Sequence, residues 1–377
     1  MRDFFIIDTT LRDGEQTAGV VFSMPEKVFI AKMLDRIGVR YIEAGIPAMG
    51  GEEKESIYEI LNLGLKAKIL TWNRAVISDV KASIDCGAKY LHISSPVSDI
   101  HISSKLKKDR RWVIDNLKRV LHYAQKFNCE ISVGAEDASR ADRAFLYTFA
   151  KIAKEEGASR FRYSDTVGVL EPFRTYEEVK RLRETVDIDI EIHVHNDFGM
   201  ATANALAAFK AGAKFVSTTI NGLGERAGNA AFEEVIMAMK YLYGHDLKIN
   251  TDLLYRLSRY VALASKRKIP SGKAIVGGEI FNYEKGLENN LVYDEIFLPE
   301  EIGLSTKLVI GKHSDIHAIV SKYHSLGIEL TEREAAFLLR YIRTWVVKNK
   351  RSLTEEELLN IYEDKKYKKG IDMLNIQ

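Results

Sequence analysis

Two histidines two positions apart, His193 and His195, are the residues of this sequence best suited to holding a metal ion. They end an apolar run typical of a strand, and residues two apart on a strand point to the same face. Asp13 follows another apolar run and would complete a two-histidine, one-carboxylate set across a closed barrel. Nitrogen and oxygen ligands without sulfur suit Mg²⁺, Mn²⁺, Zn²⁺ or Fe²⁺. The alternative is a pair of barrel-lining histidines bonded to neighbouring polar groups.

A dense polar cluster surrounds Asp13. The sequence from Asp8 to Ala18 reads DTTLRDGEQTA and directly follows the apolar stretch FFII. Burying charge is costly unless the charge is paired or bound to a metal, so Arg12 beside Asp13 at a strand end indicates a site. The alternative is a plain ion pair next to a tight glycine turn.

The elements that must position these residues alternate regularly along the chain. Short apolar runs are separated by amphipathic segments such as Glu26–Ile37 and Asp142–Glu156. Eight repeats of strand then helix are the number that closes a TIM barrel. The predicted strands are Phe4–Asp8, Tyr41–Ala44, Lys68–Trp72, Tyr90–Ser94, Glu130–Gly134, Arg160–Ser164, Glu191–His195 and Phe215–Ile220. The predicted fold class is therefore α/β, a TIM (β/α)8 barrel followed by a smaller, mostly helical C-terminal region.

Glycines mark the points where helices end and strands begin. Gly38, Gly87, Gly157 and Gly212 occupy this place in four similar phrases, which suits left-handed helix C-caps. An open doubly wound sheet would instead need a glycine-rich phosphate turn after the first strand, and Thr-Leu-Arg-Asp is not such a turn. We expect a barrel domain over residues 1–250, a linker or lid over 251–299 and a helical subdomain over 300–377.

Chemistry in a TIM barrel sits where the strands end, so the polar residues at those ends form the candidate site. In chain order they are Arg12, Asp13, Glu43, His92, Glu136, Thr166, His193, His195 and Asn229. The remaining histidines in polar or helical segments are expected at the surface: His101, His122, His245, His317 and His324.

The composition limits the partners and the location. A net charge of +2 over 377 residues gives no broad field for nucleic acid or an anionic membrane. No apolar run is long enough to span a bilayer, and no signal peptide is recognisable. Cys86 and Cys129 lack metal spacing and suit reduced thiols, so we expect a cytoplasmic protein with small-molecule partners.

These motifs, taken in order, resemble those of the pyruvate-carboxyltransferase-like condensing enzymes of the metallolyase TIM-barrel superfamily. Asp8–Gln16 resembles the first family signature, and His193–Asp197 with Gly222–Asn229 resembles the second. Within the family, Gly45–Gly50 and Ser95–Asp99 are most similar to nitrogen-fixation-type homocitrate synthases. The α-isopropylmalate synthases usually carry a further C-terminal regulatory domain, for which this chain is short. Hydroxymethylglutaryl-CoA lyases carry a cysteine in the glycine loop, which here reads Gly-Leu-Gly-Glu-Arg.

The resemblance implies roles for individual residues. It implies that a divalent ion (Mg²⁺, Mn²⁺ or Zn²⁺) is held by Asp13, His193, His195 and Asn229. Arg12 would face the keto oxygen of a 2-oxo acid, whose binding site would be lined by Gln16, Glu43, His92 and Thr166, and Glu136 would serve in acid–base chemistry. The implied reaction is condensation of acetyl-CoA, the co-substrate, with 2-oxoglutarate to give homocitrate and CoA. A homodimer is also implied.

One segment departs from the family pattern. Where the family usually has two histidines after Gly277-Gly278-Glu279, this chain has Tyr283 and Glu288. Two carboxylates placed together resist joint ionisation, so Glu288 beside Glu136 would titrate differently from a histidine. Three interpretations follow: a working synthase with Tyr283 and Glu288 in altered acid–base roles, a synthase for oxaloacetate, pyruvate or 2-oxoisovalerate, or a subunit that needs a second related subunit for activity.

Overall fold

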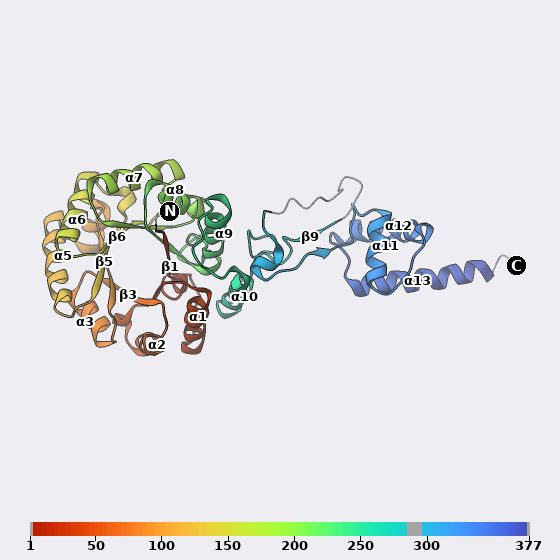
Figure 1. The fold of residues 1–377 in the computed structure, drawn as a ribbon, viewed down its shortest axis with the longest axis horizontal. Helices are drawn as coiled ribbons and strands as arrows, with labels where there is room; N and C mark the ends of the chain where they lie inside the picture. Colours follow the sequence, from red (N-terminus) through yellow and green to blue (C-terminus); the bar gives the residue numbers. More distant parts are fainter. Residues whose placement is uncertain (1–2, 285–295, 375–377) are drawn as a thin grey trace. The chain divides into compact units, whose positions relative to one another are not determined.

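The computed structural model describes residues 3–284 and 296–374, with side chains through residue 364. Eight parallel strands form a closed barrel in the order of the chain (Figure 1). They are β1 (Phe5–Asp8), β2 (Tyr41–Gly45), β3 (Lys68–Arg74), β4 (Tyr90–Pro96), β5 (Glu130–Glu136), β6 (Arg160–Asp165), β7 (Asp189–Val194) and β8 (Phe215–Thr218). The predicted TIM barrel is confirmed, and strand ends differ from the prediction by at most two residues.

Helices follow the strands and surround them (Figure 1). They are α1 (Met24–Ile37), α2 (Gly51–Leu61), α3 (Ile77–Asp85), the short α4 (Asp99–His101), α5 (Arg110–Gln125), α6 (Arg143–Glu155), α7 (Pro172–Thr185), α8 (Ala201–Ala211), α9 (Phe232–Leu242) and α10 (Leu254–Ala264). The four glycines predicted to end helices all have positive φ, and Gly38 and Gly212 are left-handed C-caps at φ 107° and 115°. Only glycine adopts this conformation without a steric penalty, which explains the sharp change from helix to strand.

Closure of the barrel depends on the pairing of its first and last strands. Asp8 of β1 is in register with Thr218 of β8 and with Ile42 of β2. Parallel register brings the carboxyl ends of all eight strands to one rim, where the polar residues named above are found. The barrel interior also holds charge, because Arg162 pairs with Glu43 at 2.6 Å and Arg160 pairs with Glu191 at 2.8 Å.

The chain divides into two compact units, residues 1–276 and 277–377. The segment expected as a linker or lid, 251–299, is thus shared between them, with α10 in the first unit. The second unit contains β9 (Asn282–Tyr283) paired with β10 (Lys307–Leu308), and the helices α11 (Ile316–Ser325), α12 (Glu332–Asn349) and α13 (Glu355–Leu374). Its core includes the fully buried Tyr323, whose hydroxyl donates to the carbonyl of Leu358. No helix in the described part of the chain is long and apolar enough to cross a membrane.

Candidate metal centre

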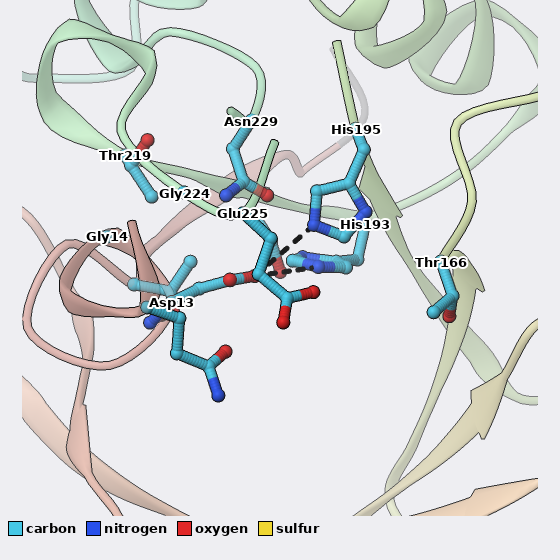
Figure 2. Close-up of polar contacts among 12 residues, drawn as sticks. Asp13, Gly14, Thr166, His193, His195, Thr219, Gly224, Glu225 and Asn229 are labelled. Atoms are coloured by element: carbon cyan, nitrogen blue, oxygen red, sulfur yellow. Dashed lines mark hydrogen bonds and ion pairs between the residues drawn. The ribbon is translucent and has the colours of Figure 1, made fainter. Parts of the chain in front are cut away.

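Three potential metal ligands converge at the rim of the barrel. Asp13 lies in the turn after β1, His193 lies on β7, and His195 directly follows β7. One ligand atom from each lies within 4.8 Å of the others, and all three residues are at least 95% buried. Figure 2 shows both imidazoles turned toward the Asp13 carboxylate. The predicted convergence of strands one and seven is therefore present.

The hydrogen bonding of His195 leaves a lone pair aimed at Asp13. Its Nδ1 lies 3.1 Å from the carbonyl oxygen of Asp165, which can only accept, so Nδ1 carries the proton. The bare Nε2 then lies 3.8 Å from Oδ2 of Asp13. Nε2 of His195 and Oδ1 of Asp13 are buried and make no hydrogen bond within the described residues, and Oδ2 of Asp13 lies 3.0 Å from Nε2 of His193. A lone pair facing a carboxylate is repulsive unless a cation lies between them, so these residues fit a divalent ion.

Asn229 offers an amide oxygen as a candidate fourth ligand beside the same cluster. It pairs with His195 through an isolated β-bridge, and its Nδ2 donates to the carbonyl of Leu223. Its buried Oδ1 has no partner among the described residues. Gly224 makes this arrangement possible, because a Cβ there would lie 2.1 Å from the Asn229 amide nitrogen. Figure 2 shows Asn229 beside His195.

Arg12 places a positive charge beside the proposed ligands. Its Nε donates to Glu43 at 2.5 Å, its Nη1 donates to Gln16 at 3.2 Å, and Nη1 lies 3.5 Å from Asp13. Burial by itself raises the pKa of Asp13, but Arg12 and His193 outweigh burial and hold that pKa below its ordinary value. Asp13 is therefore ionised and ready to bind a cation at neutral pH.

Glu43 holds the guanidinium group of Arg12 in place. It is fully buried, accepts from Thr9 and Arg162 as well as Arg12, and does not line the cavity described below. Burial raises the pKa of Glu43, but Arg12 and Arg162 prevail and hold it well below its ordinary range. A permanently ionised Glu43 fixes both guanidinium groups in place.

A cavity of about 200 Å³ opens next to this cluster. Eight of the predicted site residues line it: Arg12, Asp13, Gln16, His92, Glu136, Thr166, His193 and His195. Burial lowers the pKa of His92 well below its ordinary value, and Nδ1 of His92 lies 2.7 Å from the Ser132 hydroxyl. His92 is therefore a neutral side chain at the wall of the cavity, and its hydrogen-bonding capacity suits a polar substrate.

Glu136, at the end of β5, is held by residues from the segment after β4. His101 Nδ1 lies 2.9 Å from Glu136 Oε1, and Lys105 donates to the same oxygen. The expectation that His101 lies at the surface is therefore wrong, because its side chain is only 12% exposed. His101 sits in a polar segment, and only the fold shows that this segment turns back over β5.

Several lining residues were missed by the sequence analysis as parts of the site. They are Arg162, Ser164 and Glu225, together with Lys105. A signal for Arg162 was available, since Arg160 and Arg162 alternate with aromatic residues on a buried strand and must therefore point into the barrel. Two other predicted residues lie elsewhere: Tyr283 belongs to β9 of the second unit, and Glu288 lies outside the described residues.

The comparison with protein families identifies the chain. The HMGL-like family matches residues 3–261, which is most of the chain. The chain belongs to the HMGL-like family. Among solved structures, a hydroxymethylglutaryl-CoA lyase from Pseudomonas aeruginosa is similar with a TM-score of 0.64 and 17% identity, covering 71% of this chain and 94% of the lyase. At this identity the likeness shows the shared fold alone.

Two curated relatives are similar over nearly their whole length. The chain is 55% identical over 366 residues to 2-isopropylmalate synthase 2 of Caldanaerobacter subterraneus subsp. tengcongensis, covering 96% of this chain and 95% of the relative. It is 52% identical over 373 residues to homocitrate synthase 1 of Nostoc sp., covering 97% of this chain and 99% of that relative. Because a relative of nearly equal length is named an isopropylmalate synthase, chain length does not distinguish the two substrates as the sequence analysis assumed.

Proposed function

We propose that this protein is an acyltransferase that condenses acetyl-CoA with a 2-oxo acid in a metal-dependent Claisen reaction. The observation that carries the proposal is the buried cluster of Asp13, His193 and His195 with unpartnered ligand atoms, lying beside Arg12 in a cavity that also exposes Glu136. Relatives named homocitrate synthase and 2-isopropylmalate synthase support the same reaction class. The homodimer, the second related subunit and the cytoplasmic location expected from the sequence remain proposals.

Each side chain has a chemical task in this reaction. Asp13, His193, His195 and the Asn229 amide oxygen would hold the divalent ion. When bound, the ion supplies Lewis-acid polarisation of the 2-oxo acid's carbonyl. Arg12 is fixed by Glu43 and Gln16 and would stabilise the negative charge that develops on the former keto oxygen.

Glu136 is the proposed base. It would take a proton from the methyl group of acetyl-CoA, and the resulting enolate would attack the keto carbon. Water then cleaves the thioester and releases CoA. Tyr283 and Glu288 remain proposed contributors to the acid–base chemistry.

We favour 2-oxoglutarate as the oxo acid. The residues that line the cavity include His92, Ser94, Arg162 and Ser164, with Trp72 as the large apolar member. Polar groups suit a second carboxylate, whereas the isopropyl group of 2-oxoisovalerate would make no hydrogen bond with them. The 55% identity to a protein named 2-isopropylmalate synthase favours 2-oxoisovalerate as the second candidate.

A thiol-reagent assay for free CoA tests this function. With Mn²⁺ and acetyl-CoA present, we expect CoA release that depends on the oxo acid, with kcat/KM for 2-oxoglutarate at least about tenfold above those for oxaloacetate, pyruvate and 2-oxoisovalerate. Asp13→Asn should abolish this release, while Asp189→Asn, which alters a half-exposed aspartate paired with Lys214, should not.

Different results would overturn different parts of the proposal. A preference for 2-oxoisovalerate would overturn the substrate assignment and retain the reaction. No CoA release with any of the four acids would overturn the proposal of a self-sufficient enzyme.

A further inference from the structure

An imidazole lies against the proposed base within the same barrel. His101 ends the short helix α4, in the segment after β4, and its Nδ1 is 2.9 Å from Oε1 of Glu136. The His101 side chain is 12% exposed, whereas that of Lys105, the other donor to Oε1, is 52% exposed. The histidine is therefore the more deeply buried of the two partners of Glu136.

The surroundings of His101 decide which ring nitrogen carries the proton. Nη2 of Arg140 lies 3.3 Å from His101 Nε2, and an arginine can only donate, so Nε2 accepts. Asp137, the nearest carboxylate to Nε2, is 3.7 Å away and beyond hydrogen-bond distance. These contacts select the tautomer in which Nδ1 carries the proton and donates it to Glu136.

A rigid frame holds this pair. Asp137 follows Glu136 with a left-handed backbone (φ 61°), a conformation that a non-glycine residue keeps only where its surroundings enforce it. Its backbone N–H donates to Thr166, and its carboxylate accepts from Ser98 and Arg140. These contacts fix both Glu136 and the arginine that sets the tautomer of His101.

We propose that His101 is a positioning residue for Glu136, an inference that rests on the proposed function. The Nδ1–H of His101 holds Oε1, and no donor among the described residues reaches Oε2. Oε2 is then the oxygen that receives the proton of the acetyl-CoA methyl group. His101 thereby keeps the carboxylate correctly oriented without touching the substrate.

Replacement of His101 tests the inference in the complete protein with Mn²⁺, acetyl-CoA and 2-oxoglutarate. His101→Leu should lower kcat about tenfold, a part of the ~10²- to 10⁴-fold that a general base supplies. KM for the oxo acid should change by less than about twofold, because other residues bind that substrate. The acidic limb of the kcat–pH profile should move to higher pH, because the ionised carboxylate loses a donor.

Conservative variants separate positioning from stability. His101→Asn places an amide N–H near the Nδ1 position and should recover most of kcat, whereas His101→Gln reaches toward the Nε2 position and should not. The comparison of the Asn and Gln variants tests the inference even if His101→Leu fails to fold. The matched control is His122→Leu on α5, which breaks another histidine–glutamate contact, 2.6 Å to Glu156, and should leave all kinetic values unchanged.

The outcomes are distinct. If the unaltered protein is active and His101→Leu retains its kcat and pH profile, the inference is overturned and the proposed function stands. Equal activity of the Asn and Gln variants would also overturn it, because it would assign His101 a merely structural role. If the unaltered protein releases no CoA, the proposed function fails and the inference falls with it.

Discussion

Asp8, the last residue of β1, shows how strongly this barrel perturbs a single carboxyl group. It is fully buried, and its two oxygens accept from the backbone N–H and the hydroxyl of Thr10, each at 3.0 Å. Burial raises the pKa of Asp8 to about 7, against the opposing effect of the Thr10 hydrogen bonds and with added repulsion from Glu233 and Glu43. The carboxyl group of Asp8, which comes before Asp13 in the chain, is therefore largely protonated below neutral pH.

This pKa predicts a pH dependence of stability. Between about pH 4 and pH 7 the folded protein keeps a proton on Asp8 that the unfolded chain releases, so this group's stabilisation is complete below about pH 4 and declines as the pH rises to 7. Asp8→Asn has no such proton. The free energy of unfolding of Asp8→Asn, measured by urea denaturation, should therefore rise between pH 5 and pH 7 by on the order of 2 kcal/mol relative to that of the unaltered protein.

Asp189→Asn is the control for this measurement, because it changes a half-exposed aspartate on β7. It should keep the pH dependence of the unaltered protein. Parallel stability curves for Asp8→Asn and the unaltered protein would show that Asp8 carries its charge throughout this range.

At the scale of elements, one buried lysine joins the loops that carry the site. Lys27 of α1 is 1% exposed, and its ammonium pairs with Glu15 at 2.5 Å and also with Glu53. Glu15 accepts from the backbone of Phe22, and Glu53 accepts from the backbone of Ile46. The turn that holds Arg12 and Asp13 is thereby tied to the loop after β2.

Removing this link should be costly, because two carboxylates would be left together without a cation. Lys27→Met is expected to lower the free energy of unfolding by about 3 kcal/mol, the low end for breaking a buried pair, since both glutamates retain some exposure. Urea denaturation would measure the loss. Lys32→Met, at an exposed position of the same helix, is the control, and an equal loss in both variants would contradict this role for Lys27.

The elements and the convergence of Asp13, His193 and His195 were predictable from local signals, whereas Arg162 and the buried place of His101 were not. Apolar runs, four helix-ending glycines and the spacing of His193 and His195 each express a rule of local geometry. Arg162 and His101 depend instead on partners from other strands, Glu43 on β2 and Glu136 on β5. Such pairings are set by the barrel register and by loop paths, which short stretches of sequence do not specify.

At the scale of the whole molecule, closure of the barrel creates the centre. Asp13 follows the first strand, and the histidines belong to the seventh and to the residue after it. They meet because β8 pairs with both β1 and β7. All the proposed metal ligands therefore lie within the first compact unit, residues 1–276. The proposed metal binding is accordingly a property of the closed barrel.

Crystals of the protein grown with Mn²⁺ and measured at the manganese absorption edge give the most direct test of this account. We predict an anomalous peak at bonding distance from the Asp13 carboxylate and from one nitrogen each of His193 and His195, and the loss of this peak in Asp13→Asn. Manganese bound at other residues, with no peak among these three side chains, would contradict the account.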